Sequence, residues 1–464
     1  MLKGGRSVKK RLITAACVLF WLALWQLVAM LLNTDILLVS PIEAAARLLE
    51  LLPSAEFWRS VGFSAGRILS GFALGAVSGT VLALLAGKVR FVKTLFSPLV
   101  SAVKAVPVAS ITVLALIWVS SRNLSVLVSF LISLPIVYSN MLEGIESLDP
   151  KLNEMAKLFH VPVGSRFIGV YLSQLLPYFR SAARLAVGLS WKSGAAAEII
   201  GIPSGSIGEK LYEAKIYLET ADLFAWTIAV ILLSWLSEKV FLLLVGAAVR
   251  AVSGKRVFHH RRVSAPIRGS SAPSEIKASS LTKKYGENTV LDGFCRTFAA
   301  GQTTAVMGAS GCGKTTLVSI LTGLLKPDSG SIEVTPQDVR FSAVFQEDRL
   351  CENLTVSANI RLVTGGRRTD DEIMEALSAV GLAECAEKQA GELSGGMKRR
   401  VALVRALLAE YGAIFLDEPF KGLDEATKAQ VIGYCRSALS GKTAVLVTHD
   451  PEECEALAAD VVHM

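Results

Sequence analysis

The sequence lacks paired cysteines, internal repeats and, outside one short linker, low-complexity tracts. Its seven cysteines are scattered, and no two of them form a CxxC pair. An odd number of dispersed cysteines argues against a disulfide scaffold or a zinc site, so we expect reduced thiols that are cytosolic or buried. Charged residues make up only 19% of the 464 residues, and hydrophobic residues make up 52%. This composition excludes a single soluble domain, and it also excludes a chain that lies wholly in lipid.

The apolar residues are concentrated in the first half of the chain. Residues 1–250 consist of long apolar runs, whereas residues 276–464 have the composition of one ordinary soluble domain. Residues 251–275 are first basic and then rich in Ser, Pro and Gly, which predicts a flexible basic linker. We therefore expect a transmembrane domain, a linker and a soluble domain.

Six segments of the first half are long and apolar enough to cross a bilayer, which needs about 20 apolar residues per helix. The fifth is the weakest, because Arg180, Arg184 and Lys192 interrupt it. The first follows basic residues, as in a signal peptide, but the run is long and no small-x-small cleavage site comes after it. The expected spans are about 12–32, 61–86, 95–119, 124–144, 169–190 and 223–249.

Lysine and arginine are divided unequally between the two sides of these spans. The N-terminus, the loops after the second and fourth spans and the tail after the sixth hold sixteen of them, and the opposite loops hold five. The positive-inside rule therefore predicts a multi-pass plasma-membrane protein with both termini in the cytoplasm. The net charge of +8 does not require nucleic acid, and we expect none as a partner, because the basic residues cluster beside the apolar spans.

Four charged residues lie in or beside the expected spans, namely Arg67, Lys104, Lys192 and Glu198. Charge inside a bilayer is costly and often functional. Snorkelling, or an interior ion pair such as Lys192 with Glu198, explains these residues equally well. Both interpretations stay open.

A glycine-rich run in the soluble half fits the pattern GxxxxGK[ST] at every fixed position. It lies between an expected buried strand at 303–307 and an expected helix at about 314–323. Glycines let the backbone wrap around phosphates, and N–H groups at the start of the helix point at them. We expect Lys314 to reach the β- and γ-phosphates of ATP and the Thr315 hydroxyl to bind Mg²⁺. The expected nucleotide-binding residues here are Gly308, Ala309, Ser310, Gly311, Cys312, Gly313, Lys314, Thr315 and Thr316.

Two carboxylates follow a second apolar run, at 413–416. Asp417 can hold Mg²⁺ directly or through water, and Glu418 is placed to polarise the attacking water. His449 follows a third expected strand, at 443–447, and could sense the γ-phosphate. These segments predict an α/β P-loop nucleotide hydrolase on the side of the membrane where ATP is found.

Residues 276–464 resemble the ATP-binding subunit of ABC transporters, with seven motifs in the order of that family. The resemblance implies that Tyr285 stacks on adenine, that Gln346 links Mg²⁺ to the membrane domain, and that the signature at 393–396 contacts a partner's nucleotide. It also implies that ATP lies between two such domains, so we expect a homodimer or a pair with a similar fused chain. The residues with these implied roles are Tyr285, Gln346, Ser394, Gly395, Gly396 and, in the D-loop, Asp424.

Two features depart from the pattern of this family. Met397 ends the signature where Gln is common, and the chain ends at Met464, soon after His449. We therefore expect one polar contact near the partner's nucleotide to be missing. We also expect a final strand or helix to be short or absent.

The membrane half resembles the permeases of binding-protein-dependent importers, in particular the nitrate/sulfonate/taurine group. The loop at 150–177 resembles their coupling loop, although His160 stands where Gly is usual. A helix at about 151–160 would carry an apolar face that either fills a groove beside Gln346 or rests on lipid. The matched coupling-loop residues are Glu154, Ala156, Phe159 and Gly164.

These features predict ATP-driven import of a small solute, with a separate extracytoplasmic solute-binding protein. An exporter half-transporter is one alternative, because fused chains are common among exporters, although the cytoplasmic loops are too short for an exporter's helix extensions. A regulatory or vestigial ATPase on a membrane anchor is another, motivated by the short C-terminus.

Overall fold

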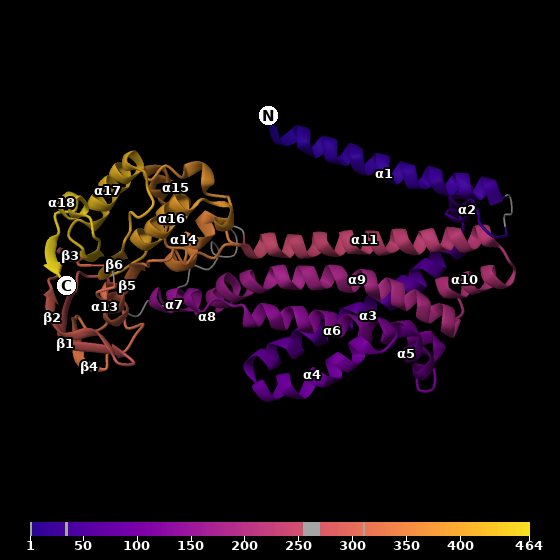
Figure 1. Cartoon of the computed structure of the whole chain (residues 1–464), viewed down its shortest axis with the longest axis horizontal. Coiled ribbons are helices and arrows are strands. Elements are labelled where there is room, and N and C mark those ends of the chain that lie inside the picture. Colours follow the sequence, from indigo (N-terminus) through magenta and orange to yellow (C-terminus); the bar gives the residue numbers. More distant parts are fainter. Residues whose placement is uncertain (1, 33–35, 254–269, 310) are drawn as a thin grey trace. The chain divides into compact units, whose positions relative to one another are not determined.

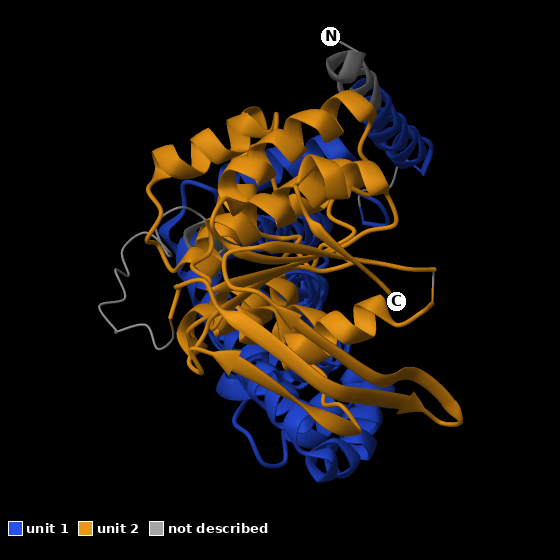
Figure 2. Cartoon of the chain, turned by 90° about the vertical axis from the view of Figure 1, so that its left-hand side faces the viewer, with its two compact units in different colours: residues 1–147, 177–246 blue, residues 148–176, 247–464 orange. Residues whose placement is uncertain are grey.

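The computed structural model describes residues 2–32, 36–253, 270–309 and 311–464. It divides into two compact units, drawn in different colours in Figure 2: residues 1–147 with 177–246, and residues 148–176 with 247–464. Residues 148–168, which lie between two expected membrane spans in sequence, and the first residues of the expected fifth span thus belong to the same unit as the ATPase. The expected linker stays a prediction, because residues 254–269 lie outside the described residues.

The first unit is built from helices (Figure 1). They are α1 (Leu2–Leu32), α2 (Pro41–Leu51), α3 (Ala55–Lys88), α4 (Arg90–Ala105), α5 (Val108–Ala115), α6 (Ser121–Glu146), α9 (Ser173–Gly201), α10 (Ile207–Ile216) and α11 (Thr220–Ser253).

By length and composition, four of the described helices can cross a membrane: α1, α3, α6 and α11. The expected third span is not one straight helix, since α4 and α5 meet at a bend of 101°. Pro107 causes the break, because proline excludes the preceding residue from helical geometry, and Val106 is extended. Most of the expected fifth span, 169–190, lies in α9, which is too polar to be a candidate span because it carries Arg180, Arg184 and Lys192. The described helices therefore give four or five candidate spans where the sequence predicted six.

A stripe of glycines brings α3 and α6 into close contact. A Cβ atom on Gly71 would lie 2.3 Å from the Val126 carbonyl oxygen, and one on Gly75 would lie 1.8 Å from the Ser133 hydroxyl. Gly79 continues the stripe at the same four-residue spacing. Without a strong hydrophobic force between helices in lipid, such small-residue faces allow the backbones to pack closely.

Glu198 is fully buried and does not pair with Lys192 as the sequence suggested. Its carboxylate accepts a hydrogen bond of 2.6 Å from Ser64 of α3. The same hydroxyl accepts a hydrogen bond of 2.9 Å from the N–H of Ile207 at the start of α10. The buried carboxylate therefore ties α9, α3 and α10 together. Arg67 instead stacks on the Phe63 ring, 3.9 Å from its centroid.

The second unit contains two sheets and the helices that pack on them (Figure 1). The strands are β1 (Glu275–Tyr285), β2 (Asn288–Phe298), β3 (Thr303–Met307), β4 (Ser329–Thr335), β5 (Phe341–Val344), β6 (Ala413–Asp417), β7 (Thr443–Val447) and β8 (Asp460–His463). The helical segments are α7 (Pro150–Leu158), α8 (Val163–Arg166), the π-helix η1 (Phe167–Leu172), α13 (Lys314–Leu321), α14 (Val356–Thr364), α15 (Asp370–Ala379), the 3-10 turns η2 (Ala383–Cys385) and η3 (Ala390–Glu392), α16 (Gly395–Leu408), α17 (Glu425–Leu439) and α18 (Pro451–Ala456).

The larger sheet is parallel and has the order β5-β6-β7-β3-β8, whereas β2-β1-β4 form an antiparallel sheet. Strands β6 and β7 are buried along their whole length, as continuous apolar strands of parallel sheets are. The final strand, expected to be short or absent, is present as β8 and pairs with β3. The carboxyl ends of β3, β6 and β7 lie at one edge of the sheet, which is where ligands bind in open α/β folds.

Candidate nucleotide-binding and hydrolysis site

The loop between β3 and α13 has the backbone that a phosphate cradle requires. Gly311 and Gly313 have positive φ angles of 86° and 102°, which favour glycine. A Cβ atom on Gly313 would lie 2.8 Å from the Val290 carbonyl oxygen, and one on Gly308 would lie 2.8 Å from the Cys312 sulfur. These two glycines therefore cannot gain a side chain without moving the loop. Ser310 lies outside the described residues.

Lys314 lies across this loop at the first position of α13. Its ammonium donates hydrogen bonds of 2.8 Å to the carbonyl oxygens of Gly308 and Ala309. The charge is thus held inside the turn of the cradle, beside the N–H groups that open the helix. A helix N-terminus with an adjacent ammonium attracts phosphate groups. Thr316, the next expected residue, is half-buried in the first turn.

Asp417 lies at the end of β6 and meets α13 through Thr315. The carboxylate is 2% exposed, and the Thr315 side chain is hydrogen-bonded to it. Burial raises the pKa of Asp417 because the charged form loses its hydration. A buried carboxylate beside a threonine hydroxyl fits Mg²⁺, whose charge would stabilise the ionised form. The cradle and this pair of oxygen donors together fit a magnesium nucleotide.

Glu418, the next residue, faces His449 across the ends of β6 and β7. Its backbone N–H donates to the Val447 carbonyl oxygen at 2.9 Å, and its φ angle is 47°, in the left-handed region. The carboxylate accepts a hydrogen bond of 2.6 Å from Lys421 and lies 4.0 Å from Nδ1 of His449. The hydrogen bond from Lys421 lowers the pKa of Glu418, so the carboxylate is ionised at neutral pH. An ionised carboxylate at this place can accept a proton from water.

The signature segment forms the start of α16. Ser394 is the N-cap of this helix and accepts a hydrogen bond of 3.4 Å from the N–H of Met397. A Cβ atom on Gly396 would lie 3.1 Å from the Gly422 carbonyl oxygen, so the signature packs closely on the D-loop. Asp424 caps α17 by accepting a hydrogen bond of 3.0 Å from the N–H of Thr427, which lowers the pKa of Asp424. The first turn of α16 leaves Ser394 and Gly395 exposed.

Tyr285 ends β1 at the hairpin that leads to β2. It pairs with Asn288 across the hairpin, and its ring is exposed, so one face is open to a planar ligand. Val290, two residues after Asn288, contacts Gly313 of the phosphate loop. The hairpin thus joins the strand that ends in the expected adenine-stacking residue to the strand that approaches the cradle.

Arg399 links the active-site loops, and the sequence analysis missed it. The guanidinium is 4% exposed and donates to the carbonyl oxygens of Phe345 and Asp417 at 2.5 Å. It also donates to the carbonyl oxygen of Glu418 at 2.7 Å and to the Asp348 carboxylate at 3.1 Å. One side chain of the signature helix therefore holds both the Gln346 loop and the Asp417–Glu418 corner.

A signal for Arg399 existed in the sequence. It stands in a row of three basic residues, 398–400, and shares a helical face with the apolar positions 402, 403 and 406, as Arg400 does with 403, 404 and 407. A basic residue on the buried face of a helix needs acceptors in the interior, because an unpaired buried charge is strongly destabilising.

We expect Arg399→Gln to lower the melting temperature of the purified chain by about 5–10 °C and to slow ATP turnover. The shorter side chain leaves several buried carbonyl groups without donors, at a cost of about 2–4 kcal/mol. Lys398→Gln is the matched control, since Lys398 pairs at 2.7 Å with the exposed Glu352 and such pairs contribute about 0–1 kcal/mol. Equal effects of the two substitutions would contradict the linking role of Arg399.

Gln346 is exposed and follows β5, and its neighbours contact the coupling segment. Lys151 of α7 donates to the Glu347 carboxylate at 2.6 Å, and Arg349 pairs with Glu154 at 3.0 Å. The Arg349 guanidinium also lies 3.9 Å from the centroid of the Phe345 ring. The loop that carries Gln346 is therefore held on one side by Arg399 and on the other by α7.

The apolar face of α7 is buried, as the sequence predicted, with Leu152, Met155 and Ala156 at 5% exposure or less. Phe159 follows it and is 9% exposed, and the guanidinium of Arg405 lies 5.5 Å from the centroid of its ring. His160 then ends the helix with a φ of 52°, the left-handed geometry that explains why glycine suits this position. Gly164 lies in α8. Glu154 thus contacts the loop after β5, and Phe159 contacts Arg405 of α16.

Arg405 connects Phe159 to the same loop. It is fully buried in α16 and donates to the carbonyl oxygens of Arg349 at 2.6 Å and Asp348 at 3.1 Å. Burial lowers the pKa of Arg405 to about 10, which still leaves it charged at neutral pH. A cavity of about 390 Å³ lies beside these contacts, between α7 and the loop at 347–353.

This architecture is that of a P-loop ATPase joined in one chain to a helical membrane domain. Residues 291–421 match the family described as ABC transporter, and residues 79–254 match the family described as binding-protein-dependent transport system inner membrane component. The aliphatic sulfonates import ATP-binding protein SsuB 1 of Rhizobium johnstonii is 40% identical over 215 residues, which cover 44% of this chain and 78% of that protein.

The sulfate/thiosulfate import ATP-binding protein CysA 2 of Chromobacterium violaceum is 36% identical over 218 residues, which cover 43% of this chain and 58% of that protein. The dimeric structure of MJ0796, a bacterial ABC transporter cassette, is 27% identical with a TM-score of 0.38, over 41% of this chain and 94% of that one. The chain belongs to the ABC transporter family. It is a multi-pass membrane protein that hydrolyses ATP and couples the hydrolysis to transport.

Proposed function

We propose that the chain imports a small organic sulfonate or a similar oxyanion, which a separate extracytoplasmic solute-binding protein delivers. The contact of α7 with the loop after β5 carries this proposal, because it joins a segment between two membrane helices to the ATPase through Glu154–Arg349 and Phe159–Arg405. The inner-membrane family match supports the binding protein. The sulfonate and sulfate import relatives support the substrate class.

We propose that the site residues divide the chemistry as follows. Lys314 and the N–H groups of the loop at 308–313 hold the phosphates, Thr315 and Asp417 hold Mg²⁺, and the exposed ring of Tyr285 stacks on the base. Mg²⁺ neutralises charge on the transferred phosphoryl group when it is bound. Glu418 orients the water and takes its proton, and His449, at 4.0 Å, limits where that carboxylate can turn. Gln346 reports the state of the site to α7.

The contacts of the signature favour a working unit with two ATPase domains. Ser394 and Gly395 are exposed, and their helix packs on its own D-loop rather than on the phosphate loop. Exposed N–H groups at the start of a helix suit a phosphate that another subunit holds. We propose a homodimer, or a pair with a similar fused chain. We also propose six membrane crossings with both termini cytoplasmic, with α4–α5 and α9 as the third and fifth.

The test is ATPase activity of the chain in proteoliposomes, with and without extracytoplasmic binding proteins of the host loaded with alkanesulfonates or sulfate. We expect a severalfold stimulation by one loaded binding protein and none by the same protein without ligand. Steady turnover that none of these proteins changes would favour export. Negligible turnover at saturating magnesium ATP would favour a regulatory or vestigial ATPase.

A further inference from the structure

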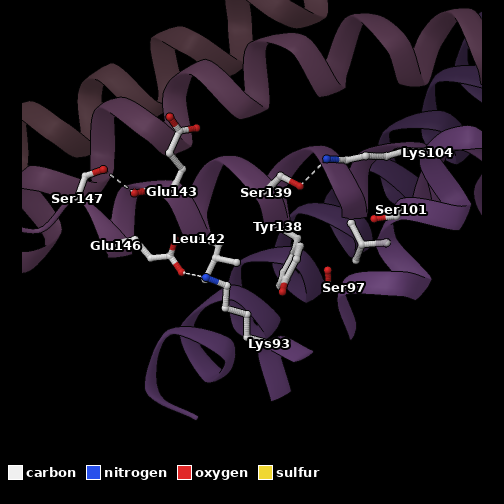
Figure 3. Close-up of a pocket in the computed structure, with 11 residues that line it drawn as sticks. Lys93, Ser97, Ser101, Lys104, Tyr138, Ser139, Leu142, Glu143, Glu146 and Ser147 are labelled. Carbon is white, nitrogen blue, oxygen red and sulfur yellow. Dashed lines mark hydrogen bonds and ion pairs between the residues drawn. The ribbon is translucent and has the colours of Figure 1, made fainter. Parts of the chain in front are cut away.

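A polar pocket lies between two helices of the membrane unit, α4 and α6 (Figure 3). Its volume is about 380 Å³. The polar side chains that α4 contributes, Lys93, Ser97, Ser101 and Lys104, recur every three or four residues and so share one face of that helix. The facing stripe of α6 holds Tyr138, Ser139, Leu142, Glu143 and Glu146, and Ser147 follows as the C-cap of this helix.

Charges are arranged unevenly along this pocket. At one end Lys93 pairs with Glu146, and the two charges cancel. At the other end Lys104 donates a hydrogen bond of 2.6 Å to the Ser139 hydroxyl, and among the described residues no carboxylate pairs with it. Lys104 lies about 16 Å from Lys93 along the axis of α4. The Lys104 end of the pocket is therefore positive, whereas the Lys93 end, which the Glu143 carboxylate also lines, carries a net negative charge.

The Tyr138 hydroxyl indicates a missing ligand independently of the unpaired Lys104 ammonium. The residue is 4% exposed, and its hydroxyl has no hydrogen-bond partner among the described residues. Figure 3 shows its ring between Lys104 and Lys93, on the same side as Ser97. A buried hydroxyl without a partner costs free energy, which a ligand oxygen would recover.

Lipid is a poor environment for this surface. In the orientation proposed above, the Lys93 end is cytoplasmic and Lys104 is near the middle of a hydrocarbon core about 30 Å thick. An unpaired ammonium and several hydroxyl groups at that depth require water or a polar ligand. One ammonium with several hydroxyl donors recognises an oxyanion, because all of these groups can donate to its oxygen atoms.

We propose that the α4–α6 pocket binds the transported oxyanion on its way to the cytoplasm, through the Lys104 ammonium and the hydroxyls of Ser97, Ser101, Tyr138 and Ser139. That the ligand is the transported solute rests on the import function proposed above, whereas binding of a small oxyanion does not.

The test measures the charge and occupancy of the pocket with a thiol introduced by Ser101→Cys in the full chain, in phosphatidylcholine nanodiscs. The rates of modification by anionic sulfonatoethyl and cationic trimethylammonioethyl methanethiosulfonate are compared, and peptide masses separate this thiol from the native cysteines. We expect the anionic reagent to be favoured at least about fivefold. Adding Lys104→Gln should remove that preference, whereas Lys88→Gln, on a lysine that does not line the pocket, should keep it.

Ligand protection distinguishes the possible sources of the anion. Ethanesulfonate at millimolar concentration should slow both reagents severalfold, and the Lys104→Gln background should abolish this protection. Protection that appears only when phosphatidylglycerol is added would identify a headgroup site and overturn the proposal. No reaction with either reagent, at this position and with Ser97→Cys, would show that the pocket faces lipid and would overturn it too.

The same nanodiscs separate this proposal from the proposed function. Stimulation of ATP turnover by loaded binding proteins tests import without reference to the pocket. Absent stimulation with Lys104-dependent protection by ethanesulfonate would reject import and keep the anion site. Normal stimulation without that protection would reject the anion site and keep import.

Discussion

Glu418→Gln is expected to reduce ATP turnover by a factor of about 10²–10⁴ and to leave ATP binding close to that of the unmodified chain. Glutamine keeps the size of the side chain and can accept the hydrogen bond from Lys421, but it cannot take a proton from water. The residues that hold the phosphates, Lys314 and the loop at 308–313, are unchanged. Turnover should therefore fall through the rate of the chemical step alone.

The measurements are the steady-state ATPase rate and the affinity for a fluorescent ATP analogue, both in nanodiscs. Glu425→Gln is the matched control, because Glu425 is an exposed carboxylate in the first turn of α17. We expect it to change neither quantity. Turnover of Glu418→Gln within about threefold of the control would remove Glu418 from the role of base.

Lys421 supplies a pH test of the same assignment. Its hydrogen bond to Glu418 lowers the pKa of that carboxyl, so the base remains ionised further into the acid range than a free glutamate does. The pH at which turnover falls on the acid side should accordingly lie below the ordinary range of glutamate. This agrees with a carboxylate that the structure keeps charged and ready to accept a proton.

The strands and turns that carry the candidate nucleotide site could be predicted from the sequence, because local rules determine them. The strands at 303–307 and 443–447 are present where they were expected, and the apolar run at 413–416 is a strand that Asp417 ends. Glycines at 311 and 313 adopt positive φ angles. A short sequence pattern specifies each of these features, and the parallel sheet brings their carboxyl ends to one edge.

The contacts between distant segments could not be predicted in the same way. Whether α4 and α5 continue as one span depends on the bend at Pro107, and the apolar character of 95–119 gives no sign of a 101° angle. The Ser64 hydroxyl rather than Lys192 meets Glu198, because i, i+6 positions do not share a face of a helix. Residues 148–176 likewise join the unit of residues 247–464 through packing between segments that are distant in sequence.

Arg399 and Arg405 show why this packing matters for coupling. They lie six positions apart on α16, and both donate to backbone carbonyls between 345 and 349. Arg399 reaches on to Asp417 and Glu418, and Arg405 reaches on to Phe159. A movement of α16 would thus shift the catalytic corner and the coupling segment together, since the same helix holds both.

Phe159→Asp should reduce transport at least tenfold while leaving the affinity for ATP unchanged. The 9% exposed ring fills the space beneath Arg405, and an aspartate there leaves part of that space empty. Its carboxylate would also compete with the carbonyl oxygens of Asp348 and Arg349 for the guanidinium. The loop that carries Gln346 would then lose one of the donors that fix it relative to α7, beside the pairs Lys151–Glu347 and Arg349–Glu154.

The readout is solute uptake per ATP hydrolysed in proteoliposomes. Val163→Asp places the same charge on the neighbouring α8, at a residue that is 79% exposed, and should leave this ratio unchanged. Phe159→Leu separates the effect of lost packing from the effect of the added charge on Arg405, because it reduces the packing without adding a charge. An intermediate ratio for leucine and a near-zero ratio for aspartate would show that both packing and the position of Arg405 transmit the signal. An unchanged ratio in all three variants would mean that transport is driven through contacts other than that of Phe159 with Arg405. The substitutions of Phe159 disturb this contact, whereas Val163→Asp leaves it in place.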